Sequence, residues 1–466
     1  DVQANFYKLK KNGEKGRQLF SRLIKRKETK EIRLHGLGKD DRFLITGTSK
    51  KSILIRIIGG KGEDQIIDES KVNGLRKMTR VYDKRNTDEL TLNTEAKKKN
   101  TDEILTFKSD QFFQYDYLNV LPSFAYNTDD GFVIGLTGTY TSQKFNKPDF
   151  GQKYNFSGFF TTNGSYNLSV LGQYREIIHN WDGLIDIAID GTDRSFRNFY
   201  GLSNENVIDD DLRDADFYEN ESSSLRFHLG LQRSFWNKSS FSFGVQYHGK
   251  DVEKEAEDGA PTIYNNIDPG NGLGGTNLLG PRVELTIDFR NSGNFPTKGV
   301  QLRAEAFHFY NTDTDFGTGG RLLSELSTFF TAGIKFPVTL ALRGGVESSY
   351  GDVPFYYKAY LGQQNNLRGF VRNRFGGDTA VYSNNDLRFH LGKVITPLVP
   401  IKYGLFGLFD TGRTWRAGES SDQWHYTYGG GIYIIPYAES FNLIFTGAQN
   451  EEGDFLFSFR VGFFVR

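Results

Sequence analysis

Apolar and polar residues alternate in many segments of the chain from residue 107 onwards, and this alternation is the strongest constraint on the fold. Successive side chains of a β-strand point to opposite faces, so a period of two residues predicts strands with one apolar and one polar face. In the last segment the apolar face comprises Phe455, Phe457, Phe459, Val461, Phe463 and Val465, and the other face includes Ser458, Arg460 and Gly462.

We therefore expect an all-β fold in this part of the chain, and two kinds of protein fit it. One is a large soluble sandwich or propeller, and the other is a 16-stranded antiparallel transmembrane β-barrel. A mean hydropathy of −0.51 does not argue against the barrel, because only every second residue of its strands faces lipid. The sixteen expected strands are residues 118–126, 131–143, 153–163, 164–175, 183–191, 222–235, 239–249, 279–290, 298–310, 321–336, 338–349, 379–391, 401–411, 425–436, 439–447 and 454–465.

The connections between these strands favour the barrel over the sandwich. From the sixth strand on, the connections after even-numbered strands are mostly short. Short turns at one end and long loops at the other are typical of outer-membrane barrels, whose long loops lie outside the cell. A final strand at the end of the chain can also close the sheet against the first strand. The longest connections, all after odd-numbered strands, are residues 192–221, 250–278, 350–378 and 412–424.

An internal repeat precedes the barrel. The segments "IRLHGLGKDDRFL" (32–44) and "IRIIGGKGEDQII" (55–67) align at an offset of 23 residues, and residues 79–92 form a looser third copy. Strand, glycine turn, acidic pair and strand make up one coil of a β-solenoid. The expected organisation is a basic N-terminal segment (1–29), periplasmic solenoid-like repeats (30–95), a linker (96–106) and the barrel (107–466), with loop 350–378 folded into its lumen.

Other classes of function find little support in the sequence. The 57 basic and 57 acidic residues balance, so we expect no nucleic-acid partner. Cysteine is absent and the seven histidines show no paired metal-ligand spacing, so we expect no enzyme, no catalytic residue and no metal site. Residues 59–67 match a calcium-binding nonapeptide, but such repeats bind calcium between successive complete copies and only one copy is complete. We therefore expect a metal-free turn and no cofactor.

The loop "NNLRGFVRNRFGGD" (365–378) carries three arginines among aromatic residues and glycines. In a wide, polar lumen such a loop can fold inward and plug the barrel. An arginine that enters a lumen of low dielectric constant needs carboxylate partners. Asp386 on the twelfth expected strand and Asp410 on the thirteenth are well placed to pair with Arg368.

The glycines of this loop suggest a backbone role. We expect Gly369, Gly376 and Gly377 to permit sharp reversals of the chain. The alternative for the loop is that Arg368 makes only a surface ion pair, worth at most about 1 kcal/mol.

Several motifs occur in the order found in one known family. They are "DFRNSGNFPTKG" (288–299), "LRGF" (367–370), "NNDLRF" (384–389), "GLFGLFDTGRTW" (404–415) and "YGGGIYIIP" (428–436). With them, most of residues 107–466 resembles the BamA superfamily of outer-membrane barrels, of the bacterial surface antigen type. Residues 1–106 are similar to the region before the barrel in members fused to an upstream calcineurin-like phosphoesterase.

The resemblance implies a sixteen-stranded barrel that assembles outer-membrane proteins or exports proteins. It implies that Arg368 is the arginine of the sixth loop, Asp386 the acid of strand 12, where glutamate is commoner, and Asp410 the acid of strand 13. The residues expected to lock the loop in the lumen are Arg368, Gly369, Phe370, Asp386, Asp410 and Gly412.

The expected function is protein insertion or translocation through a seam between the first and last strands. Pro122 removes one hydrogen-bond donor from the first strand, and Gly462 weakens the last. The seam could then open sideways, and a client strand could pair with the exposed edge. The expected location is the outer membrane of a Gram-negative bacterium, with outer-membrane lipids, lipopolysaccharide and client or partner membrane proteins as partners.

Two other functions stay open. The first is a closed barrel that anchors an upstream enzymatic or binding domain to the outer membrane, with residues 30–95 as a rigid spacer. The second is a passive diffusion channel, which is less favoured because an inward loop would obstruct the lumen.

Overall fold

The structure, a computed structural model, divides the chain into two units, residues 1–114 and 115–466. The residues it describes are 1–10, 13–74, 77–84, 89–93, 96–101, 115–145, 147, 149–191, 196–236, 238–255, 259–313, 317–333, 335–362, 366–397, 400–436 and 442–461. The expected boundary at residue 107 therefore lies outside the described residues.

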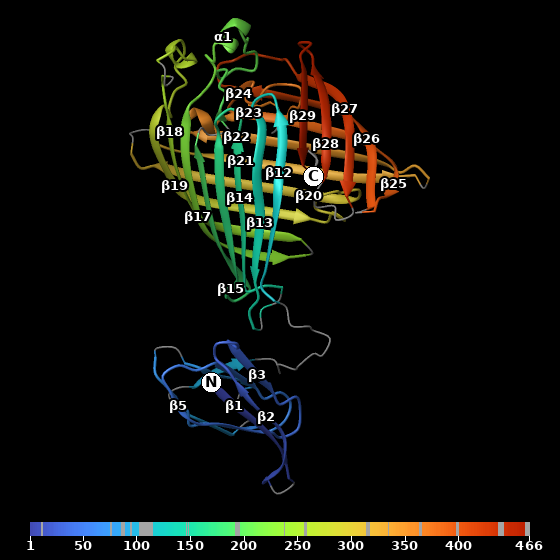
Figure 1. Cartoon of the computed structure of the whole chain (residues 1–466). Coiled ribbons are helices and arrows are strands. Elements are labelled where there is room, and N and C mark those ends of the chain that lie inside the picture. Colours follow the sequence, from blue (N-terminus) through green and yellow to red (C-terminus); the bar gives the residue numbers. More distant parts are fainter. Residues whose placement is uncertain are drawn as a thin grey trace. The chain divides into compact units, whose positions relative to one another are not determined.

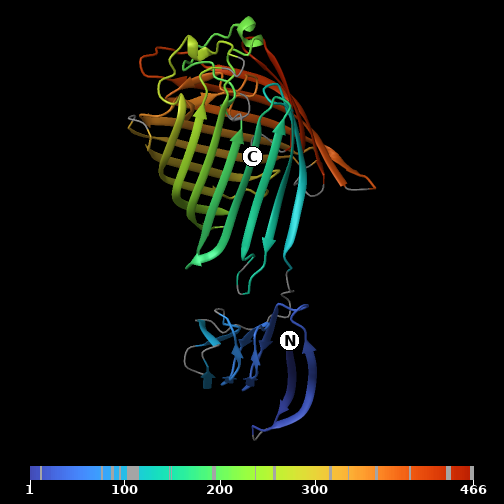
Figure 2. The same ribbon diagram turned by 60° about the vertical axis from the view of Figure 1, so that its left-hand side comes forward.

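The N-terminal unit combines a hairpin with a parallel β-solenoid (Figure 1). The hairpin, which Figure 2 shows in deep blue, pairs β1 (Val2–Leu9) with β2 (Lys15–Ile24). The solenoid has three parallel sheets, ordered β11-β9-β6-β3, β10-β7-β4 and β5-β8. Its strands are β3 (Glu31–His35), β4 (Arg42–Ile45), β5 (Thr48–Ser49), β6 (Leu54–Ile58), β7 (Gln65–Asp68), β8 (Lys71–Val72), β9 (Thr79–Lys84), β10 (Glu89–Leu92) and β11 (Ala96–Thr101).

The strand registers confirm the predicted solenoid-like repeat. Leu34 pairs with Ile57, and Ile57 lies between it and Val81 in the stack of neighbouring strands. Ile57 and Ile66 are fully buried in the core between the sheets. The acidic residues of the repeat join neighbouring coils, since Asp64 Oδ1 accepts a hydrogen bond of 2.8 Å from the backbone N–H of Asp41.

The predicted linker is partly wrong. Residues 96–101 form β11 and pair with β9, because Ala96 continues the parallel stack opposite Thr79. Residues 102–106 lie outside the described part of the chain.

The second unit is a closed barrel of sixteen antiparallel strands, as predicted (Figure 1). The chain runs round the wall from β12, in cyan, to β29, in red. The strands are β12 (Tyr117–Asn127), β13 (Gly131–Ser142), β14 (Gln152–Thr161), β15 (Tyr166–Ile178), β16 (Trp181–Gly191), β17 (Ser222–Phe235), β18 (Ser239–Val252), β19 (Gly274–Asp288), β20 (Gly299–Asn311), β21 (Thr318–Ala332), β22 (Val338–Gly351), β25 (Thr379–Ile395), β26 (Pro400–Trp415), β27 (His425–Pro436), β28 (Leu443–Asn450) and β29 (Phe455–Val461).

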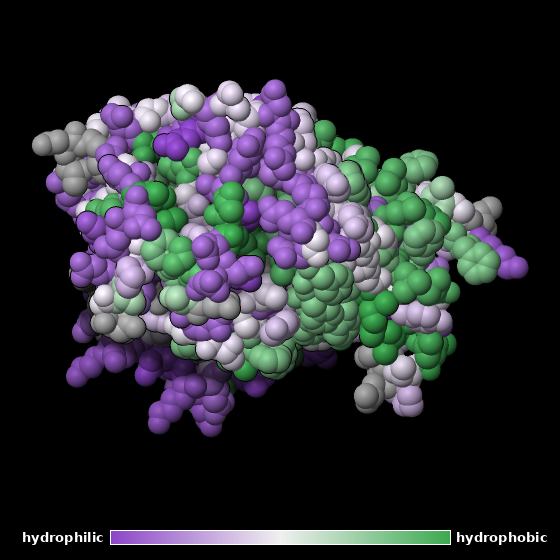
Figure 3. All heavy atoms as spheres, turned by 90° about the horizontal axis from the view of Figure 1, so that it is seen from above, coloured by the Kyte–Doolittle hydropathy of each residue, from purple (hydrophilic) through white to green (hydrophobic). Residues whose placement is uncertain are grey.

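The predicted alternation separates the two faces of the wall. On β13 the side chains of Phe132, Ile134 and Leu136 are more than half exposed on the outside, whereas Val133 is buried on the inside. We name the end of the barrel that carries the connections after β12, β14, β16 and every second strand thereafter the loop end, and the opposite end the turn end. Viewed from the loop end, the surface there is largely hydrophilic, and hydrophobic residues gather on the outer wall at the right of Figure 3.

Within the described residues, the helices are short and lie in connections between barrel strands. They are α1 (Asp210–Asp214), η2 (Ile263–Asn265) and η3 (Phe355–Tyr357). No helix in the described part of the chain is long and apolar enough to cross a membrane. Figure 2 shows α1 above the tilted green and yellow strands of the wall.

Two apolar clusters fill part of the lumen. At the loop end, an aromatic cluster joins the connections after β16, β18 and β22 to inward residues of β20. Its largest members include Phe199, Phe309 and Phe355, all fully buried. At the turn end, Phe295 of the β19–β20 connection reaches inward and packs against Tyr433, with ring centroids 5.8 Å apart. Connections between strands therefore fill part of the lumen at both ends of the barrel.

The core of the solenoid provides a test of its stability. Replacing Ile57 with Ala should destabilise the unit by about 2–5 kcal/mol, because it leaves a cavity between the stacked coils. Hydrogen exchange of the full-length chain should then be faster in residues 31–101 and unchanged in the barrel. Leu44, which is 48% exposed, is the matched control, and Leu44→Ala should have little effect. Unchanged exchange in the Ile57 variant would contradict the packing described here.

Candidate functional site

The connection between β22 and β25, residues 352–378, folds into the barrel and is called loop 6 below. It contains η3, β23 (Ala359–Leu361) and β24 (Phe375–Gly377), which form a small antiparallel pair. Its apolar side chains pack against inward residues of β25. The members of this cluster are Ala359, Leu361, Leu367, Phe370, Phe375, Ala380 and Tyr382.

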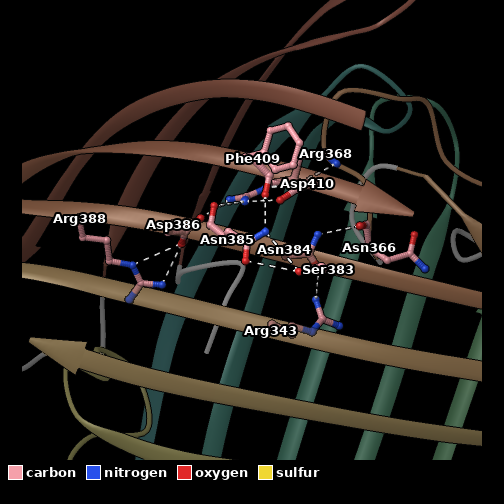
Figure 4. Close-up of polar contacts among 10 residues, drawn as sticks. All are labelled: Arg343, Asn366, Arg368, Ser383, Asn384, Asn385, Asp386, Arg388, Phe409 and Asp410. Carbon is pink, nitrogen blue, oxygen red and sulfur yellow. Dashed lines mark hydrogen bonds and ion pairs between the residues drawn. The ribbon is translucent and has the colours of Figure 1, made fainter. Parts of the chain in front are cut away.

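The structure brings Arg368 together with both expected acids (Figure 4). Its Nε and Nη2 donate to the two carboxylate oxygens of Asp410 at 2.7 and 2.6 Å. Its Nη1 donates to Asp386 Oδ1 at 2.7 Å. The backbone N–H of Arg368 also donates to Asp410, at 3.2 Å. The two acids lie on neighbouring strands, so one guanidinium joins loop 6 to both β25 and β26.

Asp386 is shared between two arginines. Its second oxygen, Oδ2, accepts a hydrogen bond of 3.0 Å from Nη2 of Arg388 (Figure 4). Arg388 is fully buried and also donates to the carbonyl oxygen of Pro296, in the β19–β20 connection. The network therefore runs from loop 6, through β25, to a connection at the turn end.

Burial separates this site from a surface ion pair. The side chain of Arg368 is 5% exposed, and those of Asp386 and Asp410 are 1% and 0% exposed. Burial lowers the pKa of the Arg368 guanidinium, but the charges of Asp410 and Asp386 outweigh it and hold that pKa above its usual range. A buried pair of this kind is expensive to break, because removing one partner leaves a charge unpaired in a medium of low dielectric constant.

The neighbouring motif residues provide space rather than reversals. Phe370 is buried and its ring lies 5.1 Å from that of Phe375. A Cβ at Gly412 would lie 3.0 Å from Leu361 of β23, so glycine leaves room for loop 6 against the wall.

The loop glycines differ in their backbone roles. Gly369 lies in a turn, in which the backbone N–H of Phe370 donates to the carbonyl oxygen of Leu367 at 3.4 Å, whereas Gly376 and Gly377 lie in β24 and make no reversal. None of Gly369, Gly376 and Gly377 has a positive φ; a Cβ at Gly369 would instead lie 2.8 Å from Thr427. The left-handed conformations of loop 6 occur at Gly362 and Asn373, with φ of 146° and 56°.

Two further arginines of the loop have carboxylate partners that the sequence analysis did not identify. Arg372 donates through Nη1 and Nη2 to the two oxygens of Asp130, at 3.1 and 2.9 Å. Its backbone N–H donates to Asp129 at 3.0 Å. Arg374 donates through Nη2 to Glu452 at 2.9 Å. The signal in the sequence that could have identified these partners is the pair of acidic turns "NTDDG" (127–131) and "NEEGD" (450–454).

Asp129 lies in the turn between β12 and β13 and is 8% exposed. Burial raises the pKa of its carboxyl group to about 6, although the positive charge of Arg372 opposes that rise. The turn therefore contains two different acids. Asp130 pairs through both carboxylate oxygens with a guanidinium, whereas the ionisation of Asp129 is unfavourable because the group is buried.

The first and last barrel strands, β12 and β29, meet at the closing seam of the barrel. Within the described residues, Tyr126 opposite Phe459 is the one register pair between β12 and β29. By contrast, β12 and β13 pair along their whole length, from Tyr117 opposite Thr141 to Asn127 opposite Gly131. Pro122 lies in β12, on the part that continues from Tyr126 towards the turn end. Gly462, the other expected seam residue, lies outside the described residues.

No cluster of three or more His, Asp or Glu side chains in the described ranges is placed to hold a metal ion. The acidic loop at residues 204–221 contains α1, and Asp209 caps this helix by accepting hydrogen bonds from the backbone N–H groups of Asp211 and Leu212.

Comparisons with known proteins identify related sequences and folds. A sequence profile of the Omp85 superfamily domain matches residues 134–462. Comparison with the curated proteins gives no significant match. The fold is similar to that of BamA from Haemophilus ducreyi, in a crystal structure lacking POTRA domains 1–3, with 13% identity, a TM-score of 0.50, and coverage of 75% of this chain and 71% of that one.

Two further solved structures match at lower TM-scores. CdiB from Acinetobacter baumannii has 13% identity and a TM-score of 0.46, over 75% of this chain and 60% of that one. CdiB from Escherichia coli has 11% identity and a TM-score of 0.45, over 74% and 63%.

Replacing Arg368 with Ala should destabilise the barrel by about 3–5 kcal/mol, because Asp410 loses its cationic partner while it stays buried. In gel electrophoresis, the temperature at which the faster-migrating folded form of the barrel disappears should fall. Protease should also cleave loop 6. The matched control is Arg303→Ala, since Arg303 pairs with Glu305 but is 49% exposed. That change should cost about 1 kcal/mol or less. Unchanged heat stability and protease resistance in the Arg368 variant would show that it does not hold the loop.

Asp129 should make stability depend on pH in a defined direction. Its pKa is raised in the folded state, so the folded chain binds the proton more tightly and loses stability as pH rises from about 4 to about 6. Asp129→Asn should match the wild type near pH 4 and be more stable by about 3 kcal/mol above pH 6, at roughly 1.4 kcal/mol per pKa unit. Thermal unfolding in detergent at several pH values measures this difference. A difference that does not change with pH would contradict the raised pKa.

Proposed function

The chain belongs to the Omp85 superfamily of outer-membrane β-barrels, and from this premise we propose that it inserts or translocates other proteins by opening the seam between β12 and β29. The role is mechanical and uses no catalytic residue. The proposed place is the outer membrane of a Gram-negative bacterium, with the loop end outside the cell and the N-terminal unit in the periplasm.

The observation that carries this proposal is the closing seam, where the first and last barrel strands, β12 and β29, meet. An unpaired strand edge offers a row of backbone N–H and C=O groups to any other strand that approaches it. Among the described residues, the register pair between β12 and β29 is Tyr126 opposite Phe459. Separating these two strands would expose the edge of β12. A client strand could then pair with β12 by β-augmentation.

The lumen next to this seam is polar and hollow. A cavity lies along the inner faces of β12 to β16. Apolar side chains, Leu121, Phe156 and Leu171, form part of its lining, and the polar residues of the lining are Asn119, Thr137, Thr139, Asn155, Ser157, Ser169 and Asp186. Hydroxyl and amide groups of this kind can exchange hydrogen bonds with the polar face of a strand before it enters the membrane. A client that enters at the turn end would thus meet a hydrated wall beside the edge with which it pairs.

Loop 6 supports the same proposal from the opposite side of the lumen. The pairs of Arg368 with Asp386 and Asp410 attach the loop to β25 and β26, so these strands can stay rigid while β12 and β29 move. The same loop and the aromatic cluster at the loop end argue against a passive diffusion channel, because they occupy the mouth of the barrel. The apolar outer wall is the proposed contact with outer-membrane lipids, and the loop end the proposed contact with lipopolysaccharide.

One observation favours a second candidate, the closed anchor. The N-terminal unit contains a regular parallel β-solenoid, an architecture suited to a rigid spacer. In this case the barrel would hold an upstream enzymatic domain, such as a phosphoesterase, at the membrane, and its seam would stay shut.

A disulfide across the seam tests the proposal, because the natural chain contains no cysteine. Tyr126→Cys and Phe459→Cys place two thiols directly opposite each other, at a spacing that suits a disulfide. In cells that depend on this barrel, oxidation should stop the assembly of newly made outer-membrane proteins, and reduction should restore it.

The matched control locks a hairpin that does not need to open. Phe124 and Ile134 lie opposite each other on β12 and β13, and a disulfide between cysteines at these positions should leave assembly unchanged. Normal assembly with the seam locked would overturn the gate and favour the anchor.

A further inference from the structure

The turns on either side of the seam are both held by loop 6. The seam is flanked at the loop end by the β12–β13 turn, residues 128–130, and by the β28–β29 turn, residues 451–454. Loop 6 passes both, and the two arginines that contact them are separated by one residue, Asn373. These contacts do not involve Arg368 and lie at the opposite end of the described seam from Pro122.

The contact with the first turn is deeply buried. The side chain of Arg372 is 4% exposed and that of Asp130 is 0% exposed, and the guanidinium contacts both carboxylate oxygens. The turn is itself preformed, because Asn127, the last residue of β12, donates to Asp130 Oδ2 at 2.7 Å. Asn127 Oδ1 also accepts from the backbone N–H groups of Asp129 and Asp130. Arg372 therefore holds the end of β12 through a rigid turn.

The contact with the last turn has two parts. Arg374, also 4% exposed, donates to Glu452 and to the carbonyl oxygen of Asn206. The next residue of loop 6, Phe375, stacks on His425 with ring centroids 3.6 Å apart. His425 Nδ1 lies 2.6 Å from Oε1 of Glu451.

Consecutive residues of loop 6 therefore hold the β28–β29 turn both directly and through His425. The register pair of the seam, Tyr126 opposite Phe459, follows these two contacts in the direction of the turn end. There the ring of Tyr126 lies 6.4 Å from that of Phe457.

We propose that Arg372 and Arg374 form a clasp across the loop end of the seam, in which Arg372 holds the β12–β13 turn and Arg374 holds the β28–β29 turn. Parting the turns would break the buried pair of Arg372 and Asp130, which is strongly unfavourable, or the contact of Arg374 with Glu452, whose side chain is 41% exposed. The clasp therefore stabilises the closed seam, and the two turns must part before the pair of Tyr126 and Phe459 can separate. This inference deepens the proposed function, because it names the residues that limit how far the seam can part.

The distance between the two hairpins tests the clasp without any client protein. Spin labels are attached to cysteines that replace Phe132 and Phe455, which are 60% and 65% exposed on the outer face near the loop end. Pulsed electron paramagnetic resonance of the full-length chain in detergent should give one narrow distance distribution. Arg372→Ala, and separately Arg374→Ala, should raise the population of separated hairpins by about tenfold to a hundredfold, the effect of losing a hydrogen bond to a charged group.

A second label pair separates the clasp from general loss of structure. Phe160 and Leu225 are 62% and 43% exposed on β14 and β17, away from the seam. Their distance distribution should stay narrow in both arginine variants. Arg372→Lys keeps the charge but not the two-pronged contact, and should give an intermediate population for the seam pair.

The outcomes are distinct. A seam distribution that is unchanged in folded Arg372→Ala and Arg374→Ala overturns the clasp, and so does equal broadening of both label pairs. If Arg372→Ala does not fold, Asp130→Asn removes the charge from the other side and the same criterion applies. Failure of the proposed function leaves this measurement intact, because a closed anchor could carry the same clasp.

Discussion

The core of a bilayer offers no hydrogen-bond partner to a peptide group, and most of the architecture follows from that constraint. Sixteen strands satisfy one another around a closed wall, and each strand from β13 to β28 pairs with two neighbours over many residues. The exception is the closing seam, which Tyr126 and Phe459 form within the described residues. The proposed insertion of client strands depends on this seam, where the first and last strands of the wall meet.

A second constraint governs the lumen, where charge is buried. Arg368, Arg372 and Arg388 are each less than 9% exposed, and each contacts an acid that is at most 1% exposed. An unpaired charge at such a depth is far more costly than a broken surface ion pair, so each of these contacts is strongly unfavourable to break. They give loop 6 a single position, although it has little regular secondary structure. Because the loop reaches β25, β26 and both turns beside the seam, its position also fixes how the ends of the barrel wall meet.

Rigid and movable parts are therefore separated within one barrel. Aromatic side chains fill the lumen at the loop end, and the β19–β20 connection fills it at the turn end. Arg388 links that connection to the ion pairs of loop 6. The polar hollow lies along β12 to β16, next to the seam. Dense packing resists rearrangement, whereas polar groups that line a cavity can exchange their hydrogen bonds with water. This division is consistent with a barrel that opens at one edge without losing its fold.

The sequence by itself determined the strands, their apolar and polar faces and the coils of the solenoid, because these depend on periods of 2 and 23 residues that are visible locally. It also identified Arg368 with Asp386 and Asp410. A cation in a lumen requires acidic partners, and the order of the motifs indicated which acidic residues these are. Only the tertiary structure decided the partners of Arg372 and Arg374, which lie 242 and 78 residues away in turns with no distinguishing motif. It also decided that Gly369 allows a close approach to Thr427, and that residues 96–101 join the solenoid. Contacts of this kind depend on which segments the closed wall brings together, and no local pattern records that.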